Sequence, residues 1–89
     1  MKFDLGQVVI TRACKATMES INADPLHYLA LHVNGDWGEL GTIDKEANEL
    51  AIKRGLRIVS RYKLPNRERI YIITEHDRSY TTMMMRDEY

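Results

Sequence analysis

The sequence predicts an α+β fold in which a mostly antiparallel sheet packs against helices. The last third of the chain alternates polar and apolar residues over three strand-length segments, 56–63, 69–75 and 80–86. A short β-branched segment, Gln7–Thr11, is typical of a further strand near the start. Between this first strand and the three C-terminal strands, the sequence has residues typical of helix starts and helix ends. We therefore expect a two-layer domain, with an N-terminal strand plus a C-terminal three-stranded meander and with helices packed on one face. The place of the first strand in the sheet cannot be read from the sequence.

Two helices are expected after the first strand. Thr11 is positioned to cap a short helix over residues 12–20. A stronger start signal follows in Asp24-Pro25, a capping residue before a proline at the first helical position. Asn34-Gly35 is a typical stop. These signals predict a second helix that ends near residue 33.

A third helix is expected from Thr42 or Asp44 to Arg54, with Gly55 as its end. Its apolar residues recur at helical spacing and are expected to be buried: Ile43, Ala47, Leu50 and Ala51. The common core is expected to draw on both layers: Leu29, Val33, Leu50, Ile58, Ile70 and Ile72.

Length and charge limit the classes of protein. The chain has 89 residues, so a single domain spanning 1–89 is expected. It has 13 basic and 13 acidic residues, and a net charge of zero argues against a dedicated nucleic-acid binder held mainly by phosphate contacts. No segment approaches the length of a membrane span, and charges within residues 1–20 are unlike a secretory signal. We expect a cytoplasmic protein.

Cys14 is the only cysteine, which excludes an internal disulfide and a cysteine-based zinc site. A structural cysteine on an apolar helix face is the expectation. His27 and His32 lie five residues apart and so do not share a helix face as metal ligands would. Neither a metal nor another cofactor is predicted.

Basic residues gather in the first meander strand. Arg57, Arg61 and Lys63 are expected on one strand face, and Tyr71 beside them on the next strand. Three interpretations remain open: a solvated face, a nucleic-acid surface that combines cations with an aromatic ring, and a surface for an acidic protein.

The second face of the meander is expected to be unusually apolar. It is expected to present five residues: Val59, Tyr71, Ile73, Met83 and Met85. A fully solvated face would not usually carry this much apolar area. The pattern predicts a contact surface, most simply between two copies of the chain.

Trp37 lies in a glycine-rich connector directly after Asp36. The indole either covers one end of the core or is an exposed anchor for a partner. Asp36 also begins a group of acidic residues that extends into the third helix. These acidic residues either stabilise the N-terminus of the third helix or form an acidic surface for a basic partner.

The segment His76–Ser79 holds a base, an acid, a cation and a hydroxyl in four residues. It is expected to be the turn between the last two strands. Partner contact and catalysis are weaker alternatives, because catalytic groups need a mutual geometry that neighbours in a turn rarely achieve.

Four sequence patterns together are similar to a family of small proteins. They are L-G-Q-V-V at Leu5–Val9, G-D-W-G-E-L at Gly35–Leu40, I-I-T-E-H-D-R-S-Y-T-T at Ile72–Thr82 and D-E-Y at Asp87–Tyr89. The chain resembles small proteins encoded on plasmids and other bacterial mobile elements. The resemblance covers nearly the full chain and implies an anti-defence role, such as inhibition of a restriction or CRISPR complex. It assigns no role to any residue.

The leading functional hypothesis is thus a non-enzymatic interaction protein that binds a host protein complex, itself, or both. One alternative is a small nucleic-acid-acting enzyme, such as a ribonuclease toxin that uses Arg57, Arg61, His76 and Arg78. The other is a nucleic-acid-binding protein that uses the basic sheet face.

Overall fold

The computed structural model describes all 89 residues and has the predicted α+β architecture. The elements follow the order β1 (Gln7–Ile10), α1 (Arg12–Ser20), α2 (Pro25–Val33), α3 (Thr42–Arg54), β2 (Ile58–Lys63), β3 (Arg69–Thr74), β4 (Tyr80–Met85) and the 3-10 helix η1 (Arg86–Glu88). The four strands form one sheet in the order β1-β4-β3-β2. β2, β3 and β4 make the antiparallel meander, and β1 lies parallel to β4 at the outer edge.

The helix signals read from the sequence have clear physical counterparts. The Thr11 hydroxyl accepts a hydrogen bond from the Cys14 backbone, and the Asp24 carboxylate accepts one from Leu26. Gly55 ends α3 in the left-handed region, with φ of 65°. Each device satisfies backbone groups that a helix end leaves unpaired.

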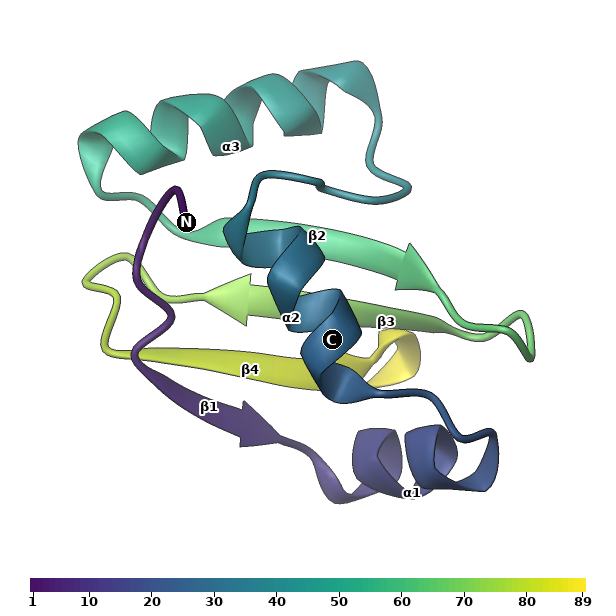
Figure 1. Ribbon diagram of the computed structural model, residues 1–89. Coiled ribbons are helices and arrows are strands. Elements are labelled where there is room, and N and C mark those ends of the chain that lie inside the picture. The colour runs from purple at the N-terminus through teal and green to yellow at the C-terminus, as the bar shows by residue number, and fades with distance from the viewer.

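Helix α2 lies across one face of the sheet, and α1 lies below it, past the end of β1 (Figure 1). Between these helices and the sheet lies a core cluster of nine buried residues: Cys14, Met18, Leu29, Tyr62, Leu64, Ile70, Ile72, Met83 and Met85. A smaller cluster of Trp37, Ala51 and Ile58 lies where α3 meets β2. Five of the six predicted core residues are buried, but they do not form one common core. Leu29, Ile70 and Ile72 share the larger cluster, whereas Ile58 belongs to the smaller one and Val33 to neither.

The predicted buried stripe of α3 is wrong for most of its length. Ile43 is 82% exposed, Leu50 is 43% exposed and Ala47 is also exposed. Only Asn48 and Ala51 are buried. The reason is the position of α3, which runs along the β2 edge of the sheet rather than across the face (Figure 1). A helix at an edge buries a narrow strip instead of a full apolar face.

The predicted facing of Met83 and Met85 is also wrong. Their neighbours in the sheet register are Ile72 and Ile70, both of which point toward the helices. Met83 and Met85 are therefore core residues, with 0% and 7% of their surface exposed. Met84 points to the other face.

The outer edge of β2 is closed by α3 and by the connector before it. The Asn48 side chain donates to the Val59 carbonyl at 2.7 Å and accepts from the Val59 amide at 3.2 Å. The connector pairs with Arg61 through an isolated parallel bridge at Gly38. Gly38 has a φ of 71°, and a Cβ there would lie 2.0 Å from the Arg61 carbonyl oxygen. This close approach therefore requires glycine.

Candidate interaction surface

The helices leave uncovered the sheet face that points away from α1 and α2, and we call it the open face. A single row of residues in register crosses all four strands on it: Val9, Thr82, Ile73 and Val59. Met84 and Tyr71 form a neighbouring pair. Val9 is 42% exposed, while Val59, Tyr71, Thr82 and Met84 are partly exposed.

Ile73 is on the predicted face but is only 4% exposed. It belongs to neither core cluster, and its cross-strand neighbours are Val59 and Thr82. Ile73 thus lies in the middle of the row between Val59 and Thr82, and its side chain is not accessible to a partner. Of the apolar residues predicted for this surface, Val59 and Tyr71 remain accessible.

The C-terminal segment reaches back over the open face. The Tyr89 ring packs on Tyr71, with 4.7 Å between the ring centroids. Arg57 lies over the Tyr89 ring at 5.7 Å and donates a hydrogen bond to its hydroxyl. Because Tyr89 is still 58% exposed, the three side chains form an accessible group that combines two aromatic rings with a cation.

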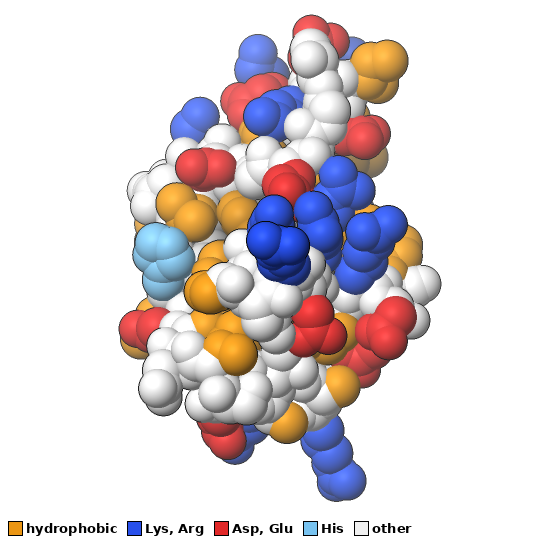
Figure 2. All heavy atoms as spheres, turned by 90° about the vertical axis from the view of Figure 1, so that its right-hand side faces the viewer, with side chains coloured by type: hydrophobic (Ala, Val, Ile, Leu, Met, Phe, Trp, Pro, Cys, Tyr) orange, Lys and Arg blue, Asp and Glu red, His pale blue; other side chains and the backbone are white.

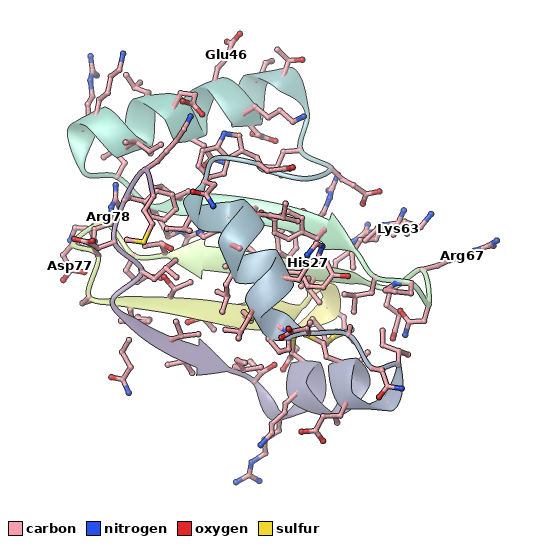
Figure 3. The ribbon with its side chains drawn as sticks, viewed as in Figure 1. His27, Glu46, Lys63, Arg67, Asp77 and Arg78 are labelled. Atoms are coloured by element: carbon pink, nitrogen blue, oxygen red, sulfur yellow. The ribbon has the colours of Figure 1, made fainter.

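Basic side chains gather at the end of the sheet that carries the β2–β3 turn. We call Arg61, Lys63, Arg67, Arg69 and Arg86 the basic end. Figure 2 shows Lys and Arg side chains grouped on this side of the molecule, and Lys63 and Arg67 extend from it in Figure 3. Arg69 donates to Glu39 at 3.0 Å. This hydrogen bond, together with the charges of Arg69, Arg61 and Lys63, lowers the pKa of Glu39.

An open hollow of about 410 Å³ lies at the basic end, between the β2–β3 turn and η1. It is lined by Arg67, Glu68, Arg69, Met85, Arg86 and Asp87. Since Met85 is its only apolar lining residue, the hollow differs from the largely apolar pockets that hold small organic ligands. Its three cations, Arg67, Arg69 and Arg86, all belong to the basic end.

Trp37 is not an exposed anchor. It is 4% exposed, stacks on Phe3 and donates from Nε1 to the Glu49 carboxylate at 2.8 Å. Its role is to close one end of the core. Asp36 is exposed, and its carboxylate accepts from the Gly38 amide at 3.1 Å, so it shapes the connector. Glu39 and Glu49 have cationic or indole partners, whereas Asp44 and Glu46 of the predicted acidic group are exposed on α3.

The turn of residues 76–79 is structural in the way its composition suggested. The Asp77 carboxylate accepts from the Ser79 amide, and hydrogen bonds from Ser79 lower the pKa of Asp77. The Arg78 guanidinium donates to the backbone carbonyls of Ala51 and Leu56, which ties the turn to the end of α3. Arg78 and Asp77 lie at the opposite end of the sheet from Lys63 and Arg67 (Figure 3).

A chain of buried polar side chains crosses the core and was not anticipated. His32 on α2 is fully buried, with Nδ1 at 2.5 Å from the Ser60 hydroxyl and Nε2 at 2.9 Å from the Thr74 hydroxyl. Thr74 continues to Thr81 at 2.7 Å, and Thr81 donates to the Leu5 carbonyl at 2.7 Å. The sequence does carry a signal for this chain, namely the hydroxyl residues Ser60, Thr74 and Thr81 at strand positions that face the core. A buried hydroxyl needs a hydrogen-bond partner, so three such residues indicate a polar network.

The donor directions in this chain follow from its last bond. Thr81 donates to a carbonyl, so it must accept from Thr74, and Thr74 must accept from Nε2–H of His32. Nδ1 of His32 is then an acceptor for the Ser60 hydroxyl. Every member is satisfied when His32 is neutral, and burial lowers its pKa from 6.5 to about 3. Ser60 is itself fully buried, so this serine–histidine pair lies out of reach of a substrate.

Cys14 is buried against Met18, as a structural cysteine would be. Burial, followed by the charge of Glu88, raises the pKa of its thiol to about 11, which keeps it protonated. No three His, Cys, Asp or Glu side chains lie close enough together to hold a metal ion. None of the helices combines the length and the apolar character needed to cross a bilayer.

Comparison of the chain with protein-family models, with curated proteins and with solved structures finds no match in any of the three.

Proposed function

We propose that this protein is a non-enzymatic interaction module that binds a partner protein through its open face and basic end. The observation that carries the proposal is the sheet face left uncovered by the helices, with apolar residues along its row and cations at one end. Interfaces of this kind combine an apolar centre with a charged rim that sets specificity.

The surface suggests the chemistry of the partner. Cations outnumber carboxylates at the basic end, where only Glu39, Glu68 and Asp87 oppose the five basic residues. A complementary partner surface would be acidic at its rim and apolar at its centre. The resemblance to mobile-element proteins favours a component of a host defence complex as that partner.

The polar residues favour binding over catalysis. The buried His32 and Ser60 are committed to the polar chain, and Arg78 is committed to backbone carbonyls. The set suggested for a ribonuclease is therefore divided, since Arg78 and His76 lie in the β3–β4 turn while Arg61 belongs to the basic end.

Affinity purification from the native host tests the proposal. Met84→Glu on the open face and Lys63→Glu at the basic end are expected to reduce recovery of the partner at least tenfold. Ala16→Glu and Lys45→Glu introduce the same residue at exposed positions on α1 and α3 and should leave recovery unchanged. Equal recovery with all four variants would refute the proposed surface.

A nucleic acid is the second candidate, favoured by one observation. Tyr71, Tyr89 and Arg57 form an exposed aromatic–cation group, and such groups stack the bases of single strands. Fluorescence anisotropy with a labelled single strand at several salt concentrations separates the two candidates. Binding that weakens with salt and is lost in Tyr89→Ala would favour nucleic acid.

A further inference from the structure

The two edge strands of the sheet differ in how far the rest of the chain covers them. The β2 edge is closed, because Asn48 bonds both backbone groups of Val59 and the connector pairs with Arg61. The β1 edge has no such cover. In Figure 1 β1 is the outermost strand, and α1 continues beyond its end rather than alongside it. An uncovered edge strand presents unpaired backbone N–H and C=O groups with which another chain can pair.

The backbone groups at this edge can be assigned from the register. The amide of Gln7 donates to the carbonyl of Ser79, directly before β4, and the amide of Thr11 donates to that of Met83 in β4. Residues of a strand alternate in the direction of their backbone groups. Gln7, Val9 and Thr11 thus bond inward to β4, whereas the amide and carbonyl of Val8 and Ile10 point out of the sheet.

We propose that two copies of the chain pair through β1, antiparallel, with a two-fold axis at Val9. In this register Val8 lies opposite Ile10 of the second copy, and Ile10 lies opposite its Val8. Each of these pairs exchanges two backbone hydrogen bonds, about four in all. Val9 then faces its own counterpart across the axis as a pair without hydrogen bonds, with Cα atoms roughly 4.5 Å apart.

The chemistry of the edge fits a second copy of itself. Gln7, Val8, Val9 and Ile10 carry no charge, so pairing brings no like charges together. A register centred between Val8 and Val9 would set side chains of opposite faces against each other, and it is excluded by the strand period of two. Centring on Val9 keeps every side chain on its own face and uses all the outward backbone groups.

The pairing also extends the open face. The row of Val9, Thr82, Ile73 and Val59 ends at the β1 edge, and the two Val9 residues would join two such rows into one. The dimer therefore has a continuous eight-stranded sheet, twice the four strands of one chain. This inference does not rest on the proposed function, because it concerns the edge and not the partner of the face.

Disulfide trapping tests the register directly. Val9→Cys places two thiols at a Cα separation within the range for a disulfide and should give a covalent dimer under mild oxidation. Val8→Cys is the matched control, since the two Val8 residues are offset by two positions along the strands and lie beyond the roughly 7 Å limit. The native Cys14 is fully buried and does not compete. Equal cross-linking of both variants, or none of Val9→Cys, would overturn the register.

Sedimentation equilibrium measures the association itself. The wild-type chain should reach a dimer at submillimolar concentration, and Val9→Lys should raise the dissociation constant at least tenfold by placing two like charges at the axis. Val59→Lys, the same change at the other end of the row, should not. A chain that stays monomeric at about 1 mM, or a dimer weakened by Val59→Lys but not by Val9→Lys, would refute pairing through β1. Circular dichroism confirms that each variant is folded.

Discussion

At the scale of single residues, His32 shows how a polar group is kept inside a small core. The imidazole is neutral, donates to Thr74 and accepts from Ser60, so the helix layer is joined to two strands by directed bonds. Apolar packing alone would fix the distance between α2 and the sheet but not their lateral position. The buried bonds add this specificity because a shifted helix would leave both ring nitrogens of His32 and the Ser60 hydroxyl without these partners.

The first prediction is a pH dependence that belongs to His32. Its pKa is about 3 in the folded state and near 6.5 when unfolded, so only the unfolded chain takes up a proton as the pH falls below 6.5. The contribution is fully present above pH 6.5 and is lost toward pH 3, at about 1.4 kcal/mol per pH unit. Urea unfolding should therefore show a loss of about 2 kcal/mol between pH 7.5 and 5.

Two histidine variants isolate this effect. His32→Gln removes the titrating group and should flatten the dependence between pH 7.5 and 5, although it lowers stability at every pH. His27→Gln changes an exposed histidine on the same helix and should leave the contribution of His32 in place. A slope that persists in His32→Gln would assign the effect to other groups.

At the scale of elements, α3 shows where sequence reasoning succeeds and where it ends. Its bounds, its glycine end and its charge distribution follow from local chemistry, and all were predictable. Which side it buries depends on where the helix lies relative to the sheet, and that is a tertiary property. The same holds for Met83 and Met85, since three consecutive methionines carry no alternation from which a facing could be read.

Truncating side chains to alanine should distinguish a buried strand residue from an exposed residue of α3. Ile72→Ala removes a fully buried side chain from the centre of the sheet and should cost roughly 2–5 kcal/mol of unfolding free energy. Leu50→Ala removes a side chain that is 43% exposed and should cost less than about 1 kcal/mol. Urea unfolding measures both. A larger loss for Leu50 than for Ile72 would mean that the placement of α3 is incorrect.

Asn48 has the most specialised task of any residue in α3. Asn48→Ala would leave the Val59 amide and carbonyl unpaired at the β2 edge, with an expected loss of about 1–3 kcal/mol. The freed edge should also make the chain more prone to aggregate on heating, as light scattering would record. Glu46→Ala, at an exposed position of the same helix, should change neither quantity. Equal behaviour of the two variants would contradict the role of Asn48.

At the scale of the whole molecule, the sheet connects two core clusters of unequal size. The larger cluster holds α1 and α2 to β3 and β4, whereas the smaller one of Trp37, Ala51 and Ile58 holds α3 to β2. The alternation of polar and apolar residues predicted that a sheet packs against helices. The edge position of β1, the polar chain and the division into two clusters depend on contacts between distant residues, which the sequence alone does not encode in any local signal.

This inequality predicts that α3 opens before the sheet does. Only Asn48 and Ala51 are buried on α3, while β3 is bonded on both sides and has four buried residues, Ile70, Ile72, Ile73 and Thr74. Regions with few buried contacts open locally at a lower free energy than the global transition. Native-state hydrogen exchange should therefore show α3 amides exchanging faster than those of β3, by at least about tenfold. Trp37, the only tryptophan, reports on the same event because its indole is bonded to Glu49 of α3. If α3 and β3 amides exchanged with the same protection, the two clusters would form one cooperative unit and the smaller cluster would be as stable as the larger.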